Sequence, residues 1–270
     1  MKKVIVLFAF LSFISLHAIE LEVDMGAGYH YSGANGELVY TKEFWKDSTA
    51  KIEHENSATF YTWAEFSSDQ EYWPKLRIEL TSLDTEGRSF IHIDSTDTIN
   101  DLVTAIEDNL PVNINNTYYD SRLVLNTYEG YLYYEYFEKS ELPTLGFGLG
   151  LKKFDFAYSA TIIEGLEFTD NGGDTVPLLF FKSRYELDKE SDGTQLSFEA
   201  DGKLFVFGDS NIYDYFLKLD FMMKYNETTD IGVELGYKET FYDIKGGDID
   251  TVGGTMQTSG LFFGVVGHFR

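Results

Sequence analysis

The 270-residue chain contains no cysteine and only 4 prolines. Without cysteine the protein has no disulfide framework, no thiolate metal site and no thiol nucleophile. Basic residues are also scarce, because 21 lysines and arginines stand against 45 acidic residues, for a formal net charge of -24. This balance argues against nucleic acid as a partner, since phosphate binding needs a concentrated basic face. No motif indicates a cofactor, and we predict none.

Long hydrophobic runs are nearly absent as well. The one such run lies at the N-terminus, where Lys2 and Lys3 precede an apolar stretch from Val4 to Ile14 and Ala18 stands at the cleavage position. This pattern predicts a signal peptide over residues 1–18 and a mature domain over residues 19–270. A helical membrane bundle is excluded, because each of its spans would need about 20 apolar residues. We expect an exported protein.

Aromatic residues, by contrast, make up 17% of the chain and recur in long alternating patterns. Between Tyr213 and Tyr225 every second residue is apolar, and the other face carries acids and lysines such as Asp214 and Lys218. Such runs exceed the five or six residues usual for strands of soluble domains and suit strands that cross a membrane at a tilt. Tyrosines at the ends of the runs fit the aromatic girdles of a membrane barrel. The pattern predicts an all-β fold, an antiparallel transmembrane β-barrel.

The alternation predicts about ten strands. They cover residues 20–31, 58–67, 75–84, 122–137, 144–157, 176–187, 194–206, 213–225, 231–243 and 257–269. Short connections at 68–74, 138–143, 188–193 and 226–230 are expected in the periplasm, and the connections at 32–57, 85–121, 158–175, 207–212 and 244–256 outside. Eight strands are an alternative, and twelve would result if residues 37–44 and 88–94 were full strands. A helical repeat from Thr98 to Leu110 predicts one short helix in an outer loop.

Several segments resemble small outer-membrane barrel proteins of Gram-negative bacteria that have no assigned activity. They are 25–29 (MGAGY), 73–79 (WPKLRIE), 131–135 (YLYYE), 146–150 (GFGLG), 210–214 (SNIYD) and 232–237 (GVELGY). The resemblance implies a barrel fold and a location in the outer membrane, and it carries over no catalytic residues. The chain departs from the usual barrel ending, because Arg270 follows the aromatic Phe269.

The interior face of the barrel is where transport would take place, and it mixes charges of both signs. The candidate lumen-facing residues are Glu22, Asp24, Arg77, Glu79, Lys152, Arg184, Lys218, Asp220 and Glu234. Eight-stranded barrels are filled by side chains whereas 16 to 18 strands leave a channel, so ten strands favour a filled lumen. A conducting lumen would prefer cations, because acids are in excess.

Other chemistry is weakly indicated. No Ser-His-Asp set can be assembled from spacing around His30, His54 or His92, so we predict no catalytic residue. Segments 170–174 and 246–250 are rich in Asp and Gly, but neither matches a full calcium loop, and we predict no metal site.

Three functions stay open. We expect first an outer-membrane barrel with a structural or surface-interaction role, second a narrow cation-preferring channel for small solutes, and third a hydrolase at the rim. The partners expected are outer-membrane lipid, lipopolysaccharide and the barrel-assembly machinery, with small solutes if the lumen conducts.

Overall fold

A computed structural model describes residues 21–40, 49–68, 73–92, 117–137, 142–163, 166–189, 194–207, 210–244 and 252–270. The predicted signal peptide and the predicted helix at 98–110 lie outside these described residues. Within the described part, no helix is long and apolar enough to cross a membrane.

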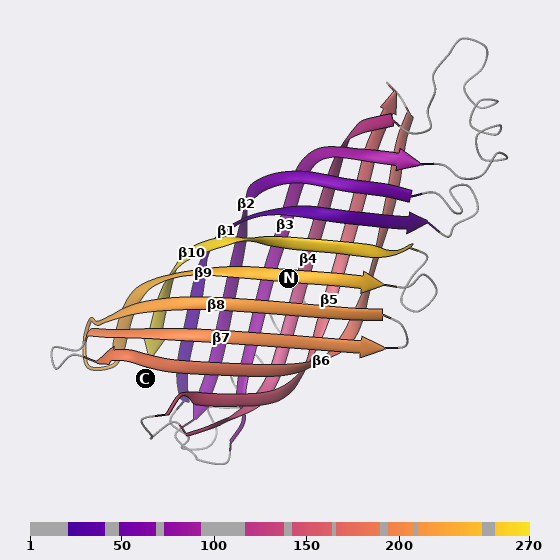
Figure 1. The fold of residues 1–270 in the computed structure, drawn as a ribbon. Helices are drawn as coiled ribbons and strands as arrows, with labels where there is room; N and C mark the ends of the chain where they lie inside the picture. Colours follow the sequence, from indigo (N-terminus) through magenta and orange to yellow (C-terminus); the bar gives the residue numbers. More distant parts are fainter. Residues whose placement is uncertain are drawn as a thin grey trace, which may run out of the picture.

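Ten antiparallel strands form a closed barrel in which each strand pairs with its neighbours in sequence and β1 pairs with β10 (Figure 1). The strands are β1 (Leu21–Tyr40), β2 (Thr49–Ser68), β3 (Lys75–His92), β4 (Thr117–Tyr136), β5 (Thr144–Ile163), β6 (Leu166–Lys189), β7 (Thr194–Phe207), β8 (Ser210–Lys224), β9 (Thr229–Ile244) and β10 (Val252–Phe269). The predicted fold class and the count of ten strands are confirmed, and the alternatives of eight and twelve are wrong.

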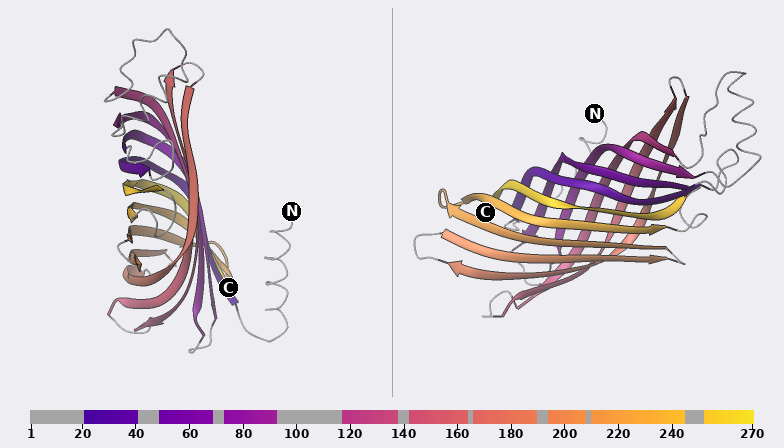
Figure 2. Two further views of the ribbon diagram at one scale, coloured as in Figure 1. Left: turned by 90° about the vertical axis from the view of Figure 1, so that its right-hand side faces the viewer. Right: turned by 45° about the horizontal axis from the view of Figure 1, so that its top comes forward.

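The two ends of the barrel differ. The end that holds the start of β1, the end of β10 and the short turn at residues 225–228 is called here the terminal end. In that turn the amides of Tyr225 and Asn226 donate to the carbonyl oxygen of Thr229, and the Asn226 side chain accepts from the amide of Thr228. The opposite end is called the distal end. There the hairpin of β5 and β6 projects beyond the other strands (Figures 1 and 2).

The predicted strand starts and ends are accurate at the terminal end and too short at the distal end. Residues 37–40 and 88–92 extend β1 and β3, and only residues 164–165 separate β5 from β6, so the outer loop predicted at 158–175 is wrong. Segment 170–174, considered for calcium, is part of β6. The acid-rich segment 246–250 lies outside the described residues.

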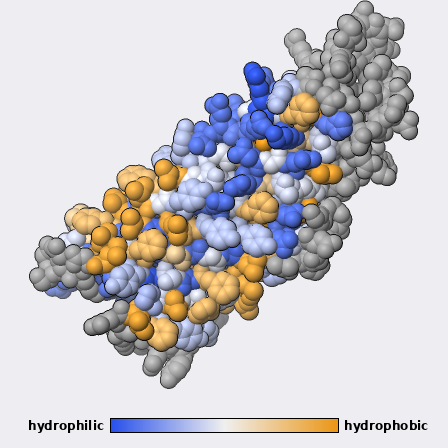
Figure 3. Space-filling model, viewed as in Figure 1, coloured by the Kyte–Doolittle hydropathy of each residue, from blue (hydrophilic) through white to orange (hydrophobic). Residues whose placement is uncertain are grey.

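The reason for this error is that the apolar residues move from the outward to the inward positions along several strands, most clearly β2 to β5. Near the terminal end, outward side chains are apolar, such as Leu217 and Leu219 of β8, while Lys218 and Asp220 point inward and are buried. Toward the distal end many outward side chains are charged, such as Glu53, and most inward ones, such as Ile52, are apolar and buried. We call these two parts the terminal half and the distal half. Figure 3 shows the same division on one face, with hydrophobic residues gathered toward the terminal end.

Candidate functional site: the barrel interior

The interior of the terminal half holds a dense group of ionised side chains, called here the charged cluster. Its cations are Arg77, Lys152, Lys182, Lys203 and Lys218, and its acids are Glu65, Glu79, Glu129, Glu199, Asp201, Asp214, Asp220 and Glu234. These residues come from eight strands, β2 to β9. Inward alternation places them together, because each occupies the interior-facing position of its strand.

Arg77 lies at the centre of the charged cluster and is only 1% exposed. Its Nε lies 2.8 Å from Glu79, and its Nη1 lies 3.0 Å from Glu199. Glu65 and Asp201 approach the same guanidinium at 3.5 and 3.6 Å. Since Glu199 belongs to β7 and Arg77 to β3, these ion pairs tie distant walls of the barrel together.

The lysines of the cluster do the same between other strands. Lys182 of β6 lies 3.1 Å from Glu65 of β2 and 3.2 Å from Glu199. Lys203 lies 2.8 Å from Glu79 and 2.7 Å from Glu129. Because these side chains span the interior and share acids, the cluster fills the cross-section of the terminal half.

Aromatic rings pack inside the same layer. The indole of Trp63 lies between two cations, with the Arg77 guanidinium 4.7 Å and the Lys218 ammonium 4.5 Å from its ring centroid. Such cation–π contacts gain strength when the groups are desolvated. The Trp63 Nε1 and the Tyr61 hydroxyl both donate to Glu234, at 3.1 and 2.6 Å. Gly26 is required beside them, since a Cβ there would lie 2.8 Å from Glu234 Oε1 and closer still to the indole.

The interior of the distal half is apolar. A single contiguous group of buried side chains, called here the apolar cluster, draws on β1 to β10 and continues down to the charged cluster. Tyr131 stacks on Phe180 with ring centroids 4.8 Å apart, and Tyr133 meets the same ring edge-on at 5.0 Å. Tyr131 also donates to Glu129, so it joins the two clusters.

A small polar group lies among these apolar side chains. His54 lies 2.8 Å from the Ser121 hydroxyl through Nε2 and 2.9 Å from the Thr85 hydroxyl through Nδ1. The Ser89 hydroxyl lies 2.8 Å from that of Ser121. All four residues are buried. The contacts satisfy polar groups that would otherwise be unpaired in an apolar core.

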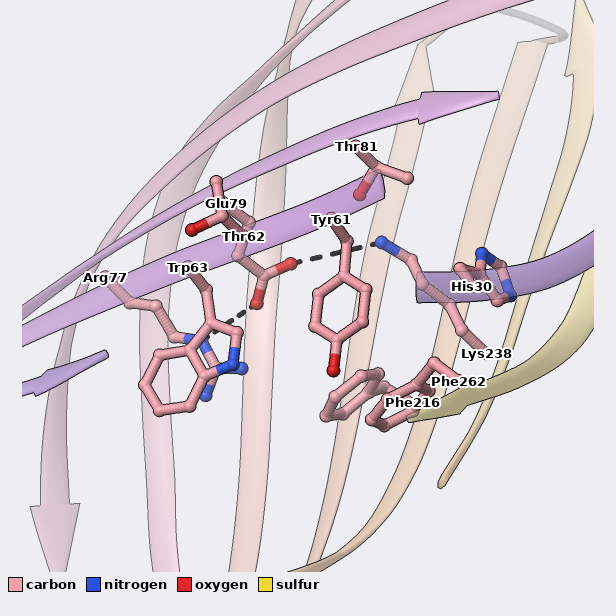
Figure 4. A pocket seen from close by; sticks show the side chains of 10 residues that line it. All are labelled: His30, Tyr61, Thr62, Trp63, Arg77, Glu79, Thr81, Phe216, Lys238 and Phe262. Carbon is pink, nitrogen blue, oxygen red and sulfur yellow. Dashed lines mark ion pairs between the residues drawn. The ribbon is translucent and has the colours of Figure 1, made fainter. Parts of the chain in front are cut away.

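The space left inside the barrel is small at its middle. A cavity lined by His30, Tyr61, Trp63, Arg77 and Lys238, among others, measures about 20 Å³, which is room for one water molecule (Figure 4). Figure 4 shows Glu79 joined to both Arg77 and Lys238 and His30 beside Lys238. A larger cavity of about 320 Å³, the vestibule, lies at the terminal end against the charged cluster.

All nine lumen-facing residues predicted from the sequence lie toward the interior. Arg77, Lys152, Lys218, Asp220, Glu234 and Glu79 belong to the charged cluster, and Glu22, Asp24 and Arg184 line the vestibule. Sequence reasoning missed Glu65, Glu129 and the interior aromatics Trp63 and Tyr131. The alternation along β4 could have shown that Glu129 and Tyr131 face inward, because they alternate with the outward Tyr128, Gly130 and Leu132.

The interior holds no metal centre that the described residues would form, because they contain no group of three or more His, Asp or Glu placed to hold an ion. The candidate histidines are separated. His30 is buried beside the small cavity, His54 lies in the polar group of the distal half, and His92 ends β3.

Comparison with known proteins adds evidence on the fold. No family model and no curated protein matches the chain. Among solved structures, the outer-membrane protease OmpT of Escherichia coli is similar with a TM-score of 0.51 and 12% identity, over 94% of this chain and 98% of OmpT. The translocator domain of the autotransporter NalP of Neisseria meningitidis follows, with a TM-score of 0.43 and 10% identity over 100% of this chain and 95% of that one. Ail of Yersinia pestis reaches 0.30 at 12% identity, over 93% and 99% of the two chains.

Proposed function

We propose that the protein is an integral outer-membrane β-barrel with a closed interior and a structural or surface-interaction role. The observation that carries the proposal is the filled interior. The charged cluster occupies the terminal half, the apolar cluster occupies the distal half, and the cavity between them measures about 20 Å³. A conducting channel would need a continuous aqueous path, so we rank it second.

The outward surface supports the placement in a membrane. In the terminal half it is an apolar band with residues such as Leu149, Leu219, Leu235 and Val265, each exposed by more than two fifths. A soluble protein rarely exposes such a continuous surface, whereas a barrel in lipid requires it. The start of β1, the end of β10 and the short turn at residues 225–228 share the end that we place in the periplasm, following the general pattern of such barrels.

The outward surface of the distal half supports contact with the external medium. It carries exposed ion pairs, Lys51 with Glu53, Asp84 with Arg122 and Lys153 with Asp155. A broad groove of about 1000 Å³ crosses the outward faces of β2 to β5 there and includes Glu86, Arg88 and Asp120. We propose this water-facing part as the region where partners bind.

Recording from purified protein in a planar lipid bilayer tests the closed interior. We expect no conductance steps, while an open 16-stranded porin inserted in the same way serves as the positive control. Steps that select for cations in the wild-type protein would replace this proposal with the channel.

We propose further that the protein is not a hydrolase. Ser121 and His54, a serine and a histidine in hydrogen-bond contact, are buried beside the apolar cluster, and a second hydroxyl, that of Thr85, holds the other ring nitrogen. A fluorophosphonate probe should leave Ser121 unmodified in folded protein. Modification that is lost in both Ser121→Ala and His54→Ala would instead identify an active site.

A further inference from the structure

The vestibule at the terminal end has the size and the lining of a ligand site. Its volume of about 320 Å³ lies at the lower end of the range for small-molecule pockets, about 300–1,000 Å³. Charged side chains from both sides of the barrel line it, and the charged cluster closes it toward the distal end.

Nearly every cation that lines the vestibule is already neutralised. Lys75 lies 2.6 Å from Glu135, Arg270 is paired with Asp230, and His268 is paired with Asp24. The cations of the charged cluster that reach the vestibule have the partners described above. Arg184 differs, since it forms no ion pair with any residue in the part of the chain that the structure describes.

The acids that interact electrostatically with Arg184, chiefly Glu199 and Asp220, form their ion pairs with other cations. Glu199 is shared by Arg77, Lys182 and Lys218, and Asp220 lies 3.1 Å from Lys218. The Arg184 Nε is buried and has no hydrogen-bond partner among the described residues, while the side chain as a whole is partly exposed and lines the vestibule. A guanidinium left in this state favours a ligand oxygen, and its planar fork matches a carboxylate in a bidentate contact.

An acid on the facing wall is in the same condition. Glu22 lines the vestibule and forms no ion pair or hydrogen bond with the described residues. It belongs to β1, whereas Arg184 belongs to β6, and these strands lie on opposite sides of the ten-stranded ring. Within the described ranges, the vestibule therefore presents, on opposite walls, one cation and one anion that form no ion pair, although acids of the cluster lie in the field of Arg184 and His268 lies in that of Glu22.

We propose that the vestibule binds a small zwitterion that carries both an ammonium and a carboxylate group, such as a dipeptide. Arg184 holds the carboxylate, and Glu22 faces the ammonium group. Two charges of opposite sign that lack ion pairs select such a ligand over a simple anion, because an anion alone would leave Glu22 without a contact and would meet the surrounding acids. This site goes beyond the proposed function, and binding in detergent solution does not depend on the protein's location or on the closure of its interior.

Isothermal titration of the purified, folded barrel with three probes tests the site. Glycylglycine carries both charges, N-acetylglycylglycine carries only the carboxylate, and glycylglycine amide carries only the ammonium group. We expect glycylglycine to bind more tightly than either derivative. Arg184→Gln should weaken glycylglycine binding by about tenfold or more and remove its advantage over the amide, because a charged hydrogen-bonded contact is lost. Glu22→Gln should remove the advantage over the acetylated probe.

Arg122→Gln is the matched control, since Arg122 is an exposed arginine on the outward face of the distal half, far from the vestibule. It should bind glycylglycine like the wild type. Circular dichroism checks that each variant is folded, and Arg184→Lys gives a second folded form that keeps the charge but loses the bidentate geometry. Equal affinity for all three probes, no binding of glycylglycine at millimolar concentration, or unchanged binding in a folded Arg184→Gln variant would each overturn the proposal.

Discussion

Arg77 shows how much of the barrel interior depends on one side chain. Its guanidinium is the shared partner of Glu79 and Glu199, and Glu65 and Asp201 lie within 3.6 Å of it. Buried charges are tolerated when they are paired and hydrogen-bonded, and they are expensive when a partner is removed. The charged cluster therefore acts as a unit in which the loss of one cation leaves several acids uncompensated.

Arg77→Met should destabilise the barrel by about 3–5 kcal/mol, because the acids around the guanidinium stay buried without a counter-charge. Urea unfolding of protein inserted in lipid vesicles, followed by tryptophan fluorescence, measures the change. Arg122→Met is the control, since Arg122 and Asp84 form an exposed pair that contributes at most about 1 kcal/mol. Equal effects of the two substitutions would show that the charged cluster contributes no more than a surface pair.

Gly26 is required for a different reason, which is close approach. A Cβ at this position would lie 2.7 Å from Trp63 Cε2 and 2.8 Å from Glu234 Oε1. Gly26→Ala should therefore displace the indole and destabilise the protein by about 1–3 kcal/mol, the usual effect of overpacking.

Gly202 offers the matched control for this substitution. A Cβ there would have no heavy atom within 4 Å, so Gly202→Ala should leave the stability nearly unchanged. The same urea unfolding measures both variants, and the fluorescence of the folded state reports on Trp63. A Gly26→Ala protein with wild-type stability and emission would contradict the packing described here.

The strands are the elements that could be predicted best from the sequence. Their number and their boundaries at the terminal end follow from apolar residues at every second position, as in β8, where Tyr215, Leu217 and Leu219 face outward. The distal parts could not be found in this way, because the apolar residues there, such as Tyr158 and Ile52, lie on the interior face. The period of two residues continues, but the apolar residues shift from the outward to the inward positions. The periodicity alone does not show which side of a strand faces out of the barrel.

The charged cluster was predictable in part for the same reason. Acids and lysines at inward positions of β8 stand against a clearly apolar outward face, so Lys218 and Asp220 could be assigned. On β4 both faces carry tyrosines, with Tyr131 inward and Tyr134 outward, and this hid the inward position of Glu129. Which acid pairs with which cation depends on the curvature of the barrel and could not be derived from spacing.

The division of the outward surface into an apolar band and a charged distal part can be tested with single cysteines, because the chain has none of its own. Glu86→Cys lies on the outward face of the distal half, Leu219→Cys lies in the apolar band, and Thr228→Cys lies in the turn at the terminal end. On whole cells a membrane-impermeant maleimide should modify only Glu86→Cys.

After the outer membrane is permeabilised, the maleimide should also modify Thr228→Cys. Leu219→Cys should stay unmodified until the protein is denatured. Modification of Thr228→Cys on intact cells would show that the orientation is opposite to the one proposed. Modification of Leu219→Cys on intact cells would show that the apolar band does not lie in the membrane.

At the scale of the whole molecule, the structure shows where the acidic, basic and aromatic residues of the chain lie. The 45 acids outnumber the 21 bases, yet the buried acids do not stand alone, because each cation of the charged cluster is shared by at least two of them. Aromatic residues are not confined to the outward face, because Trp63, Tyr131 and Phe180 are buried inside. A filled interior, together with an outward surface divided into an apolar and a charged part, supports the proposal of a barrel that crosses a membrane and extends beyond it.

The continuity of the strands through both halves has a mechanical consequence. Each strand continues from the apolar band into the distal half, and irregular pairing near this junction is confined to β1 with β2 at Ser32–Ala34 and β2 with β3 at His54–Tyr61. In the proposed outer-membrane barrel, the continuous strands would hold the distal surface at a fixed height above the bilayer. A force applied to that surface along the strands loads the backbone hydrogen bonds in shear, because these bonds lie perpendicular to the strands. A partner bound to the distal surface would therefore be held by a stiff support rather than by a flexible tether.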